Sequence, residues 1–151
     1  MRRIACWLAM ACSIGLTAHA AEVVVAQVSP ATGPLGPNGD ANYIGAKAYF
    51  DQINAQGGVA GQRIRFVRED DQYKPELMVE LIRKEAAGKT LALLLPVGSP
   101  AMTRALKEKV VDAARLPIVG VIPGAEPLRS PLNPYVFHVR AGDQDQYRRI
   151  V

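Results

Sequence analysis

The chain has 151 residues, of which 49% are hydrophobic and 21% are charged. This composition is sufficient for one folded domain with an apolar core, and it excludes an intrinsically disordered chain. The formal net charge is +4, but no basic stripe with interleaved aromatic residues accompanies it. Nucleic acid is therefore not an expected partner.

The first twenty residues have the three-part order of a secretory signal peptide. A basic pair, Arg2-Arg3, precedes an apolar segment at 4–16, and Ala18-His19-Ala20 supplies a small-x-small cleavage site. The apolar segment is too short for a membrane span. Residues 1–20 are therefore expected to be removed on export to the periplasm, leaving a mature chain that begins at Ala21.

The two cysteines both lie in this segment. A lipoprotein anchored at Cys12 is the alternative to cleavage, but Ala9-Met10-Ala11 lacks the leucine usual before a lipidated cysteine. Removal of the segment would take away Cys6 and Cys12 and leave no disulfide, thiol nucleophile or thiolate metal site. Such a chain is compatible with an oxidising compartment.

The mature chain opens with a strand, a loop and a helix. Residues 23–26 form a β-branched apolar run typical of a strand buried on both faces. A loop rich in glycine and proline follows at 33–39. Apolar residues then recur at helical spacing: Ala46, Phe50 and Ile53. The helix is predicted to end at Gly57-Gly58, and a strand that delivers a flexible loop to a helix N-terminus is a common device for holding a small polar ligand.

The same alternation continues to the end of the chain. Further strands are predicted at 63–68, 91–95, 117–121 and 135–139. Helices are predicted to begin at Pro75 and Pro100, the second one continuing through Val110-Val111, and residues 142–151 read as the start of another helix. The pattern predicts an α/β fold with a doubly wound, mostly parallel sheet and helices on both faces. Because no capping residue or terminal loop follows Val151, we expect residues 21–151 to be an incomplete domain.

Several possible catalytic or cofactor motifs are rejected on spacing. Gly88-Lys89-Thr90 follows a helix and lacks the first glycine of a phosphate loop. Gly33, Gly36 and Gly39 do not have dinucleotide-binding spacing. Neither an enzyme nor a metal or cofactor site is therefore expected.

Two other candidate groups receive structural interpretations. His138 lies inside a strand and is interpreted as a core or sheet-face histidine rather than a catalytic base. Asp70-Asp71 could be a metal or acid–base pair, but a solvated strand end is the favoured interpretation.

The sequence from Thr32 to Asp71 resembles the leucine/isoleucine/valine-binding protein family, the type I periplasmic solute-binding proteins of ABC importers. The run Asn54-x-x-Gly57-Gly58-x-x-Gly61 is its most specific part, and further similarity follows at 94–106 and 117–141. The resemblance implies a clamshell of two doubly wound α/β lobes that close on a ligand. This chain would supply most of the N-terminal lobe.

The resemblance also implies a ligand site. In that family, a hydroxyl and backbone N–H groups of the first lobe hold the carboxylate of an amino acid. The matching residues of this chain are Ser99 and Gly98, the loop residues Gly124 and Ala125, and Asn38. Ser99 would lie at the start of a helix, where free N–H groups and the helix dipole favour an anion. The alternative is a serine that only caps the helix, worth ~1 kcal/mol.

Three residues of the implied site depart from the family pattern. Asn38 takes a position that is often aromatic in branched-chain binders, Pro123 replaces a common threonine, and Asp143 stands where a tyrosine is usual. These changes make an ordinary leucine-type ligand doubtful and open the possibility of a more polar or aromatic carboxylate.

The resemblance implies a periplasmic, non-catalytic binding protein that delivers a small amino acid or related carboxylate to a membrane ABC permease. The alternative is an extracytoplasmic sensing domain of a signalling receptor or regulator, since the same fold serves both roles. Sequence that follows the lobe would separate them: a sensor continues into a transmembrane helix or a regulatory domain.

Overall fold

The computed structural model describes residues 21–150, so the predicted signal peptide at 1–20 and the alternative anchor Cys12 lie outside the described residues. The elements follow in the order β1 (Glu22–Ser29), α1 (Gly36–Ala55), β2 (Arg63–Asp70), α2 (Pro75–Ala87), β3 (Thr90–Leu94), α3 (Ser99–Lys107), α4 (Val110–Ala114), β4 (Ile118–Val121), the 3₁₀ turn η1 (Glu126–Leu128), β5 (Val136–His138) and α5 (Asp143–Ile150).

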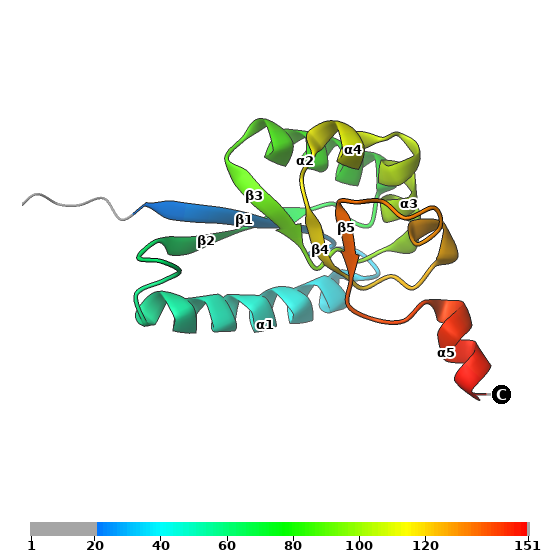
Figure 1. Ribbon diagram of the computed structural model, residues 1–151, viewed down its shortest axis with the longest axis horizontal. Helices are drawn as coiled ribbons and strands as arrows, with labels where there is room; N and C mark the ends of the chain where they lie inside the picture. Colours follow the sequence, from blue (N-terminus) through cyan, green and yellow to red (C-terminus); the bar gives the residue numbers. More distant parts are fainter. Residues whose placement is uncertain (1–20, 151) are drawn as a thin grey trace, which may run out of the picture.

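The five strands form one parallel sheet in the order β2-β1-β3-β4-β5. Helix α1 lies on one side of this sheet, and α2, α3 and α4 lie on the other, while α5 extends away at the C-terminal end (Figure 1). The predicted α/β fold with helices on both faces is therefore confirmed, and most of the apolar run at 91–95 forms β3, the central strand of the sheet.

The main core lies between the sheet and α2, α3 and α4. Its buried side chains include Ala26, Val28, Met78, Ile82, Met102, Val111 and Ile118. On the other face, α1 packs on β2 through aromatic residues. The ring of Phe66 stacks on Tyr43 with 5.0 Å between centroids and meets the edge of Phe50 at 5.2 Å.

Two helices differ from the prediction in their bounds. The helix predicted to run from Pro100 through Val110-Val111 is broken in two, because Lys109 adopts a left-handed conformation with φ 53°. Helix α1 begins at Gly36, so part of the expected glycine loop is helical. A side chain at Gly39 would collide with the carbonyl oxygen of Pro30, which explains why glycine occupies a first-turn position.

Candidate functional site

Segments that follow all five strands meet at the carboxyl edge of the sheet, where they line an open hollow of about 250 Å³. We call it the strand-end hollow. In strand order, its lining residues are Leu35 after β1, Tyr73 after β2, Val97, Gly98 and Ser99 after β3, Ile122, Pro123 and Gly124 after β4, and Arg140 with Asp143 after β5. The order β2-β1-β3 reverses direction between β1 and β3, and open α/β sheets bind ligands at such a switch point.

The structure brings together three of the predicted site residues. Gly98, Ser99 and Gly124 all line the strand-end hollow. Asn38 and Ala125 do not line it; Asn38 is exposed on α1, where its N–H donates to the carbonyl of Leu35. The geometry thus unites the loops after β3 and β4, as the resemblance implied, and leaves out the position on the first helix.

Ser99 is the first residue of α3 and is partly exposed. The N-cap residue is Gly98, with φ 108°, and no side chain caps this helix by a hydrogen bond. The alternative of a serine that only caps α3 is therefore wrong. Because the first-turn N–H groups have no intrahelical partner, the Ser99 hydroxyl and these groups together form a donor set suited to an anion.

Asp143, one of the three departures from the family pattern, packs against Gly124. Its backbone N–H donates to the Gly124 carbonyl at 2.8 Å, and its carboxylate accepts from Arg140 at 3.1 Å. The positive charge of Arg140 and the negative charge of Asp143 therefore neutralise each other beside the hollow, where both side chains are near 44% exposed.

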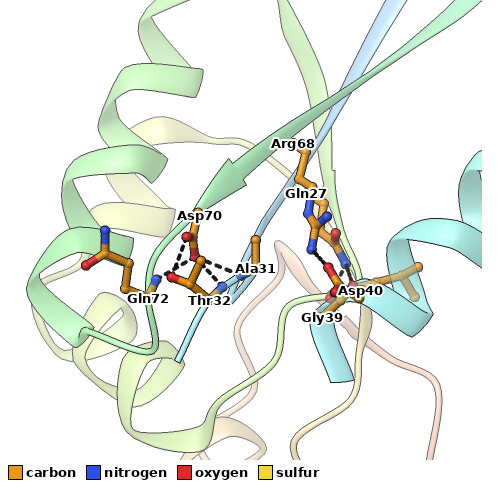
Figure 2. Close-up of polar contacts among 9 residues, drawn as sticks. Gln27, Ala31, Thr32, Gly39, Asp40, Arg68, Asp70 and Gln72 are labelled. Atoms are coloured by element: carbon orange, nitrogen blue, oxygen red, sulfur yellow. Dashed lines mark hydrogen bonds and ion pairs between the residues drawn. The ribbon is translucent and has the colours of Figure 1, made fainter. Parts of the chain in front are cut away.

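Asp70 ties the loop after β1 to the end of β2. Its Oδ1 accepts the N–H groups of Ala31 at 2.7 Å, Thr32 at 3.2 Å and Gln72 at 2.9 Å, and its Oδ2 accepts the Thr32 hydroxyl at 2.7 Å (Figure 2). Burial works to raise the pKa of Asp70, but these hydrogen bonds outweigh it and lower the pKa to about 2.

Asp71 is fully buried, at 0% exposure. The prediction of a solvated end for the Asp70-Asp71 pair is therefore wrong for Asp71. Its Oδ1 accepts the N–H of Tyr73 at 2.9 Å, while Oδ2 is buried with no hydrogen-bond partner among residues 21–150. Burial raises the pKa of Asp71 to about 6; the hydrogen bond from Tyr73 opposes the rise, and the neighbouring Asp70 adds to it.

Polar side chains also join β1 to the start of α1. Gln27 is fully buried, and its amide nitrogen lies 3.5 Å from the Gly39 carbonyl and 3.4 Å from the Leu95 carbonyl. Arg68 on β2 pairs with Asp40 on α1 (Figure 2). These contacts fix the N-terminal end of α1 beside the strand-end hollow.

His138 has the structural role expected of it. It lies in β5, and its Nε2–H donates to the Leu128 carbonyl at 3.0 Å. Burial lowers the pKa of His138; that hydrogen bond opposes the shift and Arg129 reinforces it. No group of three or more His, Cys, Asp or Glu side chains that could hold a metal ion occurs within residues 21–150.

A larger hollow of about 340 Å³ lies between the C-terminal end of α3, α4 and the proline-rich loop at 123–134. Its lining contains none of the predicted site residues, and it lies outside the loops at the carboxyl ends of β1, β2 and β3. The strand-end hollow is therefore the better candidate for a ligand site.

A family model for periplasmic binding proteins matches residues 22–151. The chain is 35% identical over 78 residues to an amino acid binding protein of Pseudomonas aeruginosa, and 35% identical over 75 residues to a Leu/Ile/Val-binding protein of Citrobacter freundii. These alignments cover 51% and 50% of the chain, and 21% and 20% of the two relatives.

Solved structures extend the similarity to most of the chain. An extracellular ligand-binding receptor from Verminephrobacter eiseniae is 41% identical with a TM-score of 0.82, over 86% of this chain and 37% of that one. A substrate-binding periplasmic protein from Ralstonia solanacearum is 36% identical with a TM-score of 0.77, over 82% and 35%. The resemblance drawn from the sequence is confirmed, and the chain spans about a fifth of those curated relatives and about a third of these structures.

Proposed function

The chain belongs to the periplasmic binding protein family, and from this premise we propose that it contributes one wall of a binding site for a small carboxylate, as the substrate-binding component of an ABC importer. The observation that carries the proposal is the convergence of segments from all five strands on one hollow, with Ser99 at the N-terminus of α3. A hydroxyl and unbonded first-turn N–H groups favour a carboxylate over an amine.

Relatives support the class of ligand. The Citrobacter freundii relative is a Leu/Ile/Val-binding protein, and a Desulfitobacterium hafniense structure of the same fold is described as a complex with Leu. An amino acid or a related carboxylate captured in the periplasm and passed to a membrane permease is therefore the function we propose. Solute-binding proteins of this family generally catalyse no reaction, so we propose no enzymatic activity.

Titration of the isotope-labelled chain by NMR tests the carboxylate site. L-leucine should shift the backbone amides of Ser99 and Ala101, whereas isoamylamine, which has the same side chain and amine but no carboxylate, should leave them in place. Equal shifts with both compounds, or shifts confined to other loops, would contradict the proposal. NMR detects binding at millimolar concentrations, which matters because a ligand held by one wall remains partly solvated.

Export is the second part of the proposal. A bacterium that expresses the chain with its own N-terminus should place it in the periplasm, beginning at Ala21. N-terminal sequencing of the recovered protein checks this, because a retained Met1 or a lipid-modified Cys12 would exclude cleavage after Ala20.

A further inference from the structure

The ring of Tyr73 lies against Gly98, the residue that precedes Ser99. A Cβ atom added at Gly98 would stand 2.9 Å from Cε2 and 3.2 Å from Cδ2 of this ring, so the ring occupies the space that any larger residue would need. Both residues line the strand-end hollow. An aromatic ring is therefore part of the wall beside the N-terminus of α3.

The turn that carries Tyr73 is held in a specific conformation. Tyr73 has φ 61°, a left-handed value that is uncommon for a residue with a side chain. The N–H of Tyr73 donates to Oδ1 of the buried Asp71 at 2.9 Å, and the N–H of Lys74 donates to the Asp71 carbonyl at 2.8 Å. A strained backbone conformation maintained by a buried carboxylate indicates that this turn has a fixed place in the wall.

Several of the residues that line the strand-end hollow are apolar. Leu35, Val97, Ile122 and Pro123 line the same hollow, and its two charged residues, Arg140 and Asp143, pair with each other. A ligand held through its carboxylate at Ser99 would therefore have these apolar side chains and the Tyr73 ring within the same hollow. Apolar walls with a few placed polar groups are typical of sites for small molecules.

We propose that Tyr73 is a specificity-determining residue, and that the preferred ligands are carboxylates that bear an aromatic ring. This inference rests on the proposed carboxylate site and adds the ligand class. Paired aromatic rings attract each other beyond the effect of buried area, through offset-stacked or edge-to-face geometry, whereas a saturated ring of similar size gains only the area. The expected selectivity for the aromatic ring is about three- to tenfold in Kd.

Three probes separate the carboxylate contact from the ring contact. Acetate reports the carboxylate site alone, phenylacetate adds an aromatic ring, and cyclohexylacetate adds a saturated ring with the same number of carbon atoms. Dissociation constants come from the shift of the Ser99 amide on titration of the labelled chain. Cyclohexylacetate is the more hydrophobic of the two ring compounds, so tighter binding of phenylacetate cannot arise from buried area alone.

Variants assign the selectivity to Tyr73. Y73L should abolish the preference for phenylacetate over cyclohexylacetate, whereas Y73F, which keeps the ring, should keep the preference. Y49L is the matched control, since Tyr49 is a 61% exposed aromatic on α1. The hydrogen bond to Asp71 comes from the backbone N–H of residue 73, so both variants should keep the turn. Amide spectra and melting temperatures of Y73L and Y73F check that the turn still folds.

The outcomes are distinguishable. The ligand class would be overturned if the wild-type chain bound phenylacetate no more tightly than cyclohexylacetate, or if Y73L kept the preference. In either case, acetate binding at Ser99 would still support the proposed function. A Y73L variant that weakened acetate as much as phenylacetate would show a structural role for Tyr73 only. No shift at Ser99 with any probe would overturn the carboxylate site and this inference with it.

Discussion

The carboxylate of Asp71 and the backbone N–H of Tyr73 are joined by a hydrogen bond of 2.9 Å, and through it a buried acid holds a wall of the strand-end hollow. The preceding residue, Asp70, bonds to Ala31 and Thr32 instead. Asp70 is the last residue of β2, and Asp71 is the first residue of the turn that follows it. One pair of neighbouring aspartates therefore positions two of the loops that form the candidate site.

Asp71 should make stability depend on pH between about 4 and 6. Its pKa is about 6 in the folded chain and about 3.9 when unfolded, so the folded state binds the proton more tightly. The neutral carboxyl therefore supports folding fully below pH 4, and this contribution is lost as the pH rises through 6. The change is on the order of 2–3 kcal/mol.

The D71N variant isolates this effect, because asparagine keeps an oxygen that can accept the Tyr73 N–H but does not ionise in this range. The unfolding free energy of wild type relative to D71N, from urea denaturation, should fall between pH 4 and pH 7. D145N, at an exposed carboxylate on α5, serves as the control for general charge effects. A constant difference between wild type and D71N across this range would show that Asp71 is not held at a raised pKa.

Asp70 should stabilise the fold in the opposite pH direction. Its pKa is about 2 when folded, so its contribution is present above pH 4 and is lost as the pH falls toward 2. D70A leaves the N–H groups of Ala31 and Gln72 without their acceptor and should cost about 1–3 kcal/mol at pH 7. Thermal unfolding measures this cost, and a loss below 0.5 kcal/mol, the usual range of surface substitutions, would mean that water replaces the carboxylate without penalty.

A pair of glycine substitutions tests the contact between Gly98 and Tyr73. G98A places a methyl group within 2.9 Å of the Tyr73 ring on a residue with φ 108°, and should cost about 1–3 kcal/mol. G45A adds a methyl group with no atom within 4 Å in the middle of α1, and should stabilise by about 0.5–1 kcal/mol. Urea denaturation of both variants should therefore give changes of opposite sign, and two changes of the same sign would contradict the geometry.

The fold could be predicted because its signals are local. Short apolar runs alternate with helical periodicity, and the proline residues at Pro75 and Pro100 lie in the first turns of α2 and α3. The break at Lys109 was not predictable in this way, because a lysine gives no sign of a left-handed backbone conformation. The extension of β1 to Ser29 was also missed, since Gln27 and Ser29 are polar residues in a buried strand.

The candidate site was predicted only in part, for a related reason. Ser99 and Gly124 were found through family motifs, whereas Tyr73 lies 25 residues before Gly98 in sequence and meets it only because the sheet order brings the ends of β2 and β3 to one edge. A search of residues that follow each predicted strand would have identified it. Asp71 was misjudged because two adjacent acids resemble a solvated turn, and only the packing shows that one of them is buried.

The most direct test of the carboxylate site is the effect of S99A on the binding of acetate, followed through the amides of α3. The account predicts that binding weakens by about 1–3 kcal/mol, since the carboxylate loses one donor that is oriented by the first turn of α3. S130A, at an exposed serine in the proline-rich loop, should bind acetate as the wild type does. Equal affinity in S99A and wild type, with both variants folded, would contradict the account and place the anion elsewhere.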